Sequence, residues 1–162
     1  MKTINRTHKL FNRVSIRAVE AFRVETYVTG RKRVVEVEAT RTGALAVHRR
    51  IRGIGARDEA LVAKDYTVST ADGTARLHVD VSDGKAAVEF AIRAQLGADW
   101  RKFARALARA NAADDEDTSR RALAPFVRAQ LDATDDLRKL DPDVRVKFHD
   151  EKRWRKFLLC AH

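Results

Sequence analysis

The sequence has few of the residues that cross-link or interrupt a fold. Its 162 residues include one cysteine, two prolines and seven glycines. A single cysteine, Cys160, cannot form a disulfide within the chain, so packing must hold the fold, as is typical of a reducing compartment. So little proline and glycine excludes a linker-rich or low-complexity chain. The length predicts one domain with a single core.

Long apolar runs are also missing. No stretch approaches the roughly 20 apolar residues that a membrane span needs. The first nine residues lack the apolar segment of a signal peptide. We therefore expect a soluble protein with no membrane partner. Its expected location is the cytoplasm, or a virion if the protein is a structural subunit of a virus or phage.

Positive charge is what the chain has in excess, with a formal net charge of +10. Residues 1–57 contain 14 Lys or Arg against 4 acidic residues, residues 58–143 contain 13 against 17, and residues 144–162 contain 6 against 2. Two basic ends around an acidic middle attract polyanions without specifying a fold. Arg outnumbers Lys 23 to 10, so codon bias is an alternative source of part of this excess.

Alternating apolar and polar residues predict strands in the first part of the chain. The first runs from Val14 to Val28, where Glu20 interrupts the apolar face and predicts a bulge or turn near residues 19–21. A turn at residues 29–32 leads to a second strand. Residues 49–55, with two glycines and three arginines, are predicted to form an exposed basic loop.

Two Asp-Gly pairs predict hairpins between residues 66 and 96. Asp72-Gly73 and Asp83-Gly84 each separate alternating runs, which is a strong short-range hairpin signal. We therefore predict a three-stranded meander whose last strand directs Val88, Phe90 and Ile92 inward.

The apolar period changes to about 3.6 after Gly97, which predicts amphipathic helices. The first spans residues 98–112 and is expected to cover the sheet with Trp100, Phe103 and Leu107. In the second, Pro125 predicts a start near Ala124, because proline is awkward in a helix interior.

A short strand, Val144–Phe148, and an amphipathic segment, Trp154–Leu159, are predicted to close the chain. Strands followed by helices favour an α+β fold, with an antiparallel sheet covered by helices. The predicted organisation is one domain over residues 1–162. Residues 1–97 are mainly strands, residues 98–140 are helical, and residues 141–162 form a basic C-terminal strand and tail.

Basic side chains concentrate in three short segments and along one helix face. Arginine and lysine neutralise phosphates, so this pattern predicts a non-enzymatic, charge-driven protein that binds nucleic acid, DNA or RNA. Trp154 is expected in the core first and as a base-stacking group second. The predicted contacts are Arg31, Lys32, Arg33, Arg49, Arg50, Arg52, Arg101, Arg105, Arg153, Trp154 and Arg155. Nucleic-acid binding is favoured more strongly if the segments at 31–33, 49–52 and 152–156 lie on one face of the molecule.

Self-association is the alternative, because segregated charge can also join copies into a symmetric assembly such as a viral or phage coat or tail. A third hypothesis is a metal-dependent phosphate-processing enzyme. Glu36 and Glu38 are alternate carboxylates on one strand and could share a divalent ion. Over these few residues the pattern resembles the acidic strand of tunnel-type hydrolases, although Arg41 is off the expected spacing.

The remaining candidates favour structural roles. His149, Cys160 and His162 are zinc-ligand types at irregular spacing, and Cys160 is expected to be a buried apolar residue. His48 and His78 are isolated and expected to be solvated. We therefore predict no catalytic residue, no metal and no cofactor.

Overall fold

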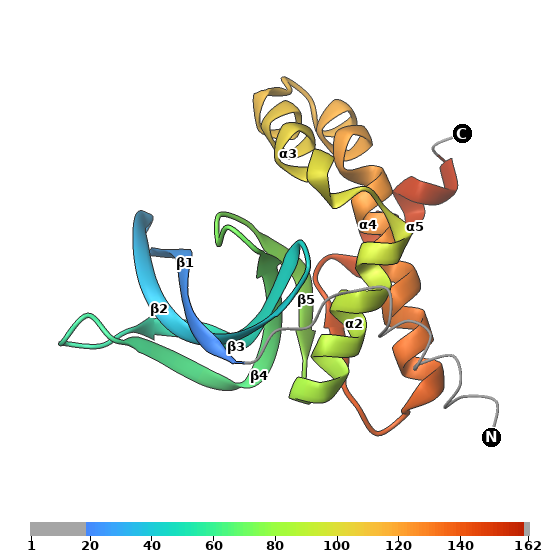
Figure 1. The fold of residues 1–162 in the computed structure, drawn as a ribbon. Helices are drawn as coiled ribbons and strands as arrows, with labels where there is room; N and C mark the ends of the chain where they lie inside the picture. The colour runs from blue at the N-terminus through green and yellow to red at the C-terminus, as the bar shows by residue number, and fades with distance from the viewer. Residues whose placement is uncertain (1–18, 161–162) are drawn as a thin grey trace.

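The computed structural model describes residues 19–160, in which an antiparallel sheet is followed by helices (Figure 1). Each strand pairs with the next one along the chain, so the sheet is a meander. This confirms the predicted α+β fold. The strands are β1 (Glu20–Val28), β2 (Arg31–Thr42), β3 (Leu45–Ile54), β4 (Ala60–Thr70), β5 (Arg76–Val81) and β6 (Val146–Phe148).

A tight turn joins β1 to β2. Thr29 and Gly30 have φ angles of 49° and 77°, the left-handed conformations that a two-residue hairpin needs. The turn is therefore shorter than predicted, and Arg31 already pairs with Val28. Pairing runs without interruption from Glu20 to Val28, so the described part of β1 has no bulge, while residues 14–18 lie outside the described residues.

The sheet curls until its β4–β5 turn meets β1. The Glu25 amide donates a hydrogen bond of 2.8 Å to the Gly73 carbonyl oxygen. The result is a trough in which β1 and β2 form one wall, and the β4–β5 turn contacts that wall at β1 (Figure 1). Its apolar interior contains Phe22, Val24, Val35, Val37, Ala39 and Ala46.

The predicted last strand of the meander is a helix, α2 (Gly84–Gly97). Asp83 does not begin a hairpin turn, because its side chain accepts a hydrogen bond from the Ala86 amide and caps the helix. Phe90 and Ala94 are fully buried at helical spacing against the sheet. An alanine-rich segment with a capping aspartate favours a helix over a strand.

The helix predicted over residues 98–112 is present as a 3₁₀ turn, Trp100–Lys102, and α3, Phe103–Ala112. Its aromatic residues pack mainly on α4 (Glu116–Leu140), whereas α2 covers the sheet. Trp100, Phe103 and Phe126 form three ring contacts with centroids 5.1–5.3 Å apart.

Helix α4 continues through Pro125, so the predicted start near Ala124 is wrong. It begins after Asp115, whose side chain accepts a hydrogen bond from the Thr118 amide. That cap and the burial of Phe126 and Val127, the two residues after Pro125, offset the hydrogen bond that proline removes.

The predicted last strand is present as β6, which pairs with β5. The following segment is helix α5 (Glu151–Cys160), held on α4 by the buried Trp154. Cys160 is exposed rather than buried, because it lies at the free end of α5. Among residues 19–160, no helix is long and apolar enough to cross a membrane.

Candidate nucleic-acid interface

The first predicted basic segment begins β2 instead of lying in the turn. Lys32 forms an ion pair of 2.8 Å with Glu25. Arg33 forms one of 2.8 Å with Asp58 in the β3–β4 turn. Arg31 is exposed.

The predicted loop at residues 49–55 is mostly strand, because β3 extends to Ile54 and pairs with β4 through two register shifts. The Arg49 guanidinium lies 5.0 Å from the centre of the Tyr66 ring. Arg50 donates two hydrogen bonds, of 2.9 and 3.2 Å, to Asp65, and this contact lowers the pKa of the Asp65 carboxyl. Arg52 is exposed.

The helical basic residues are also largely paired. Arg101 binds Asp99 at 3.0 Å, while Arg105 is exposed. Arg153 donates a hydrogen bond of 2.6 Å to Glu116, and Arg155 donates one of 2.7 Å to Asp135.

Trp154 is only 5% exposed, and the Arg120 guanidinium lies 4.5 Å from its ring centre. It packs in the core, as first expected, and has no free face on which a base could stack.

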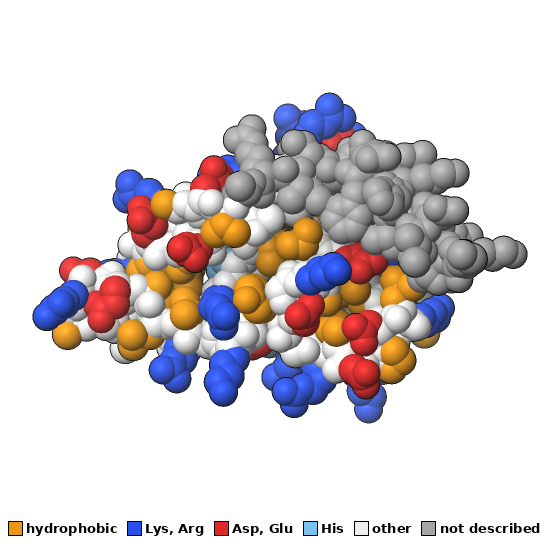
Figure 2. Space-filling view, turned by 60° about the horizontal axis from the view of Figure 1, so that its bottom comes forward, with side chains coloured by type: hydrophobic (Ala, Val, Ile, Leu, Met, Phe, Trp, Pro, Cys, Tyr) orange, Lys and Arg blue, Asp and Glu red, His pale blue; other side chains and the backbone are white. Residues whose placement is uncertain are grey.

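The three predicted segments do not share one face. The Arg33–Asp58 contact brings residues 31–33 beside the β3–β4 turn, but α5 lies at the opposite end of the molecule against α4 (Figure 1). Acidic and basic side chains are interspersed on the surface that Figure 2 shows. Residues 1–18 contribute five of the 33 Lys and Arg residues and no acidic residue, and they lie outside the described residues.

Three other cations, which were not predicted from the sequence, do lie close together. Lys64 on β4, Arg145 before β6 and Lys147 on β6 line a cleft of about 360 Å³, the cationic cleft. All three are exposed. Within residues 19–160, none of them forms an ion pair with a carboxylate. Asp65, Asp80, Val81 and Ser82 complete the lining.

The two carboxylates in the cationic cleft already have cationic or hydrogen-bonding partners. Asp65 is bound by Arg50. Asp80, whose side chain is 9% exposed, accepts a hydrogen bond of 2.6 Å from Nε2 of His149. The second oxygen of Asp80, Oδ1, is buried without a hydrogen-bond partner, whereas the three cations are exposed to an anion from outside.

Backbone hydrogen bonds fix the edge of the cationic cleft. The Ser82 amide donates to the Arg145 carbonyl oxygen at 3.0 Å, and the Arg145 amide donates to the Ser82 hydroxyl at 2.9 Å. Together with the β5–β6 pairing, these bonds hold Arg145 and Lys147 beside Lys64. Only the apolar–polar alternation at Lys147 pointed to any of them in the sequence.

The side chains of zinc-ligand type form no metal site within the described residues. His149 is bound to Asp80, Cys160 is exposed at the end of α5, and His162 lies outside the described residues. The part of the chain from residue 19 to 160 contains no group of three His, Cys, Asp or Glu side chains placed to hold a metal ion. Glu36 and Glu38 instead line a separate, larger pocket.

Glu151 links α5 to α4 through ion pairs. We therefore expect its charge to contribute to the stability of the fold. Arg138 and Arg155 both bind this carboxylate and lower its pKa from 4.5 to about 2. A lowered pKa stabilises the fold above pH 4.5, and that contribution is lost as the pH falls toward 2. We expect Glu151→Gln to lower the free energy of unfolding by about 1–2 kcal/mol at pH 7. Urea titrations should show the difference shrinking below pH 4.5; a constant difference would contradict this account.

The chain matches no protein-family model, no curated protein and no solved structure.

Proposed function

We propose that this protein binds nucleic acid through the cationic cleft. The supporting observation is that three exposed cations, from two segments far apart in the sequence, meet in one cleft whose carboxylates already have other partners. Most of the arginines that the sequence predicted as contacts are held by neighbouring acidic residues, which weakens their attraction for phosphate.

The chemistry favours a polyanion over a single small anion. Phosphates spaced along a strand can each contact one cation, and the release of condensed counterions adds to the affinity. Lys64 and Lys147 reach outward on flexible stems, and Arg145 can bind a phosphate through two nitrogens. Such contacts recognise the backbone of DNA and RNA alike.

Three residues that the sequence predicted as contacts are exposed but lie outside the cationic cleft, so the proposal does not depend on them. Arg31 begins β2, Arg52 lies on β3 and Arg105 lies on α3; each remains a proposed secondary contact. No acidic partner within residues 19–160 binds Arg52 or Arg105. A long nucleic acid could reach them after binding at the cationic cleft.

The proposal is tested by fluorescence anisotropy with labelled single-stranded and duplex DNA and RNA at 50–300 mM salt. We expect affinity for every probe to fall with salt, with log K against log salt having a slope of about −3 for duplex DNA and about −2 for single strands at three phosphate contacts. Absent binding at 50 mM salt, or a flat salt dependence, would refute it. Light scattering on the same sample tests the self-association prediction.

A further inference from the structure

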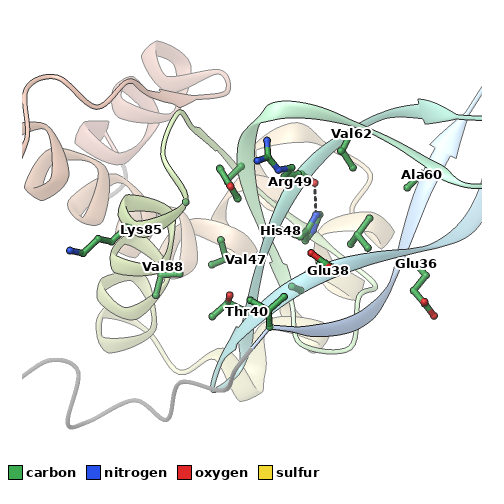
Figure 3. A pocket seen from close by; sticks show the side chains of 15 residues that line it. Glu36, Glu38, Thr40, Val47, His48, Arg49, Ala60, Val62, Lys85 and Val88 are labelled. Carbon is green, nitrogen blue, oxygen red and sulfur yellow. Dashed lines mark hydrogen bonds between the residues drawn. The ribbon is translucent and has the colours of Figure 1, made fainter.

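A second, larger pocket opens where β2 and β3 separate. The two strands pair only from Ala39–Thr42 to Leu45–His48. Beyond His48, β3 stays with β4 while β2 follows β1, which leaves an opening beside α2. This sheet pocket has a volume of about 670 Å³ (Figure 3), within the range that binds small molecules.

The lining is mostly apolar. Val47, Val88 and Val62 come from β3, α2 and β4, and they surround the space together with Val37 and Ala39. Val62 is 41% exposed, so the pocket has an apolar rim that a ligand would cover. Its wall also includes Tyr66, whose ring is covered by the Arg49 guanidinium.

The basic groups around the sheet pocket are occupied or point away from it. Arg49 lies over the Tyr66 ring and donates hydrogen bonds of 3.4 and 3.3 Å to the carbonyl oxygens of Ala63 and Lys64. Lys85 extends away from the sheet (Figure 3).

His48 adds no positive charge to this space. It is 2% exposed, and burial lowers its pKa. Its Nδ1–H donates to the Arg49 carbonyl oxygen at 2.8 Å, and Nε2 accepts from the Ser69 hydroxyl at 2.8 Å. His48 is therefore a neutral wall residue, not the solvated histidine that the sequence suggested.

The acidic groups, unlike the basic ones, include a side chain that points into the sheet pocket and has no ion-pair partner among the described residues. Glu38 directs its carboxylate into the space between β2 and β3, whereas Glu36 points away (Figure 3). Glu38 is exposed and forms no ion pair with a residue between 19 and 160. Among the described residues, Glu38 is therefore a charged side chain that points into this pocket without a partner (Figure 3).

We propose that the sheet pocket binds a small organic cation with an apolar or aromatic body and one amine. The ammonium group would bind Glu38, and the body would cover Val47, Val62 and Val88. This site is separate from the cationic cleft and does not depend on nucleic-acid binding.

Three probes with the same ring and different charge test the ligand class. Amide NMR spectra of the full chain are recorded with benzylamine, benzyl alcohol or benzoate at millimolar concentration. We expect benzylamine to bind most tightly, with shifts at Val47, Val62 and Val88. Equal binding of benzyl alcohol would overturn the role of Glu38, and tighter binding of benzoate would overturn the sign of the charge. No binding of any probe would overturn the site itself.

Two variants locate the interaction. Glu38→Gln should weaken benzylamine about fivefold and leave benzyl alcohol unchanged, because it removes only the charge. Asp132→Asn is the matched control, since Asp132 is an exposed carboxylate on α4, and it should change neither affinity. Val62→Trp should fill the pocket and abolish the binding of both benzylamine and benzyl alcohol. Equal effects of Glu38→Gln and Asp132→Asn would contradict the proposal.

Discussion

Replacing Gly73 by alanine is expected to lower the free energy of unfolding by about 3 kcal/mol. Two effects add at this position. The φ angle of +75° is strained for alanine, and the new Cβ would collide with the carbonyl oxygen of Arg23. That oxygen lies on β1, where the β4–β5 turn closes the trough, so the collision would separate the turn from β1. Urea titration followed by circular dichroism measures the loss.

Gly30→Ala is the matched control for this prediction. Gly30 has a nearly identical φ of +77°, but a Cβ there would have no heavy atom within 4 Å. Gly30→Ala should therefore lower the free energy of unfolding by only about 1 kcal/mol, the cost of a strained backbone. Equal losses for the two variants would mean that the contact between the turn and β1 contributes nothing.

Phe90→Ala is expected to lower the free energy of unfolding by about 3–5 kcal/mol. Phe90 is fully buried where α2 packs on the sheet, so its removal leaves a cavity between two layers. Leu96→Ala, on the same helix at 43% exposure, should cost less than about 1 kcal/mol. Thermal and urea unfolding of both variants measures the difference. Similar small losses would contradict the packing of α2 described above.

The two Asp-Gly pairs show how far local sequence determines this fold. Asp72-Gly73 forms the predicted hairpin turn, with Gly73 at positive φ. Asp83-Gly84 has the same residues but starts α2, because aspartate is equally suited to capping a helix. The helical spacing of Phe90, Ala91 and Ala94 distinguishes the two cases. The alternation of Val88, Phe90 and Ile92 concealed that spacing, so a helix was predicted as a strand.

The candidate interface could be predicted less well than the fold. Lys64 and Lys147 lie more than eighty residues apart and meet only because β6 returns to pair with β5. No local pattern encodes that pairing. Conversely, basic segments are conspicuous in sequence, but the fold supplies their acidic partners, as it does for Arg50 and Arg155. Charge density along the chain therefore overstated the number of free cations.

The most direct test of nucleic-acid binding by the cationic cleft compares two triple variants with the same change in net charge. Lys64→Ala, Arg145→Ala and Lys147→Ala remove the three cleft cations. The matched variant carries Arg109→Ala, Arg128→Ala and Lys139→Ala, which are exposed on α3 and α4.

The measured quantity is the slope of log K against log salt for one labelled single strand. We expect the cleft variant to lose about 2 from the magnitude of this slope, about 0.7 for each phosphate contact on a single strand, while the matched variant loses less than about 1. Equal slopes for the two variants would contradict it, because binding would then follow net charge rather than the cationic cleft.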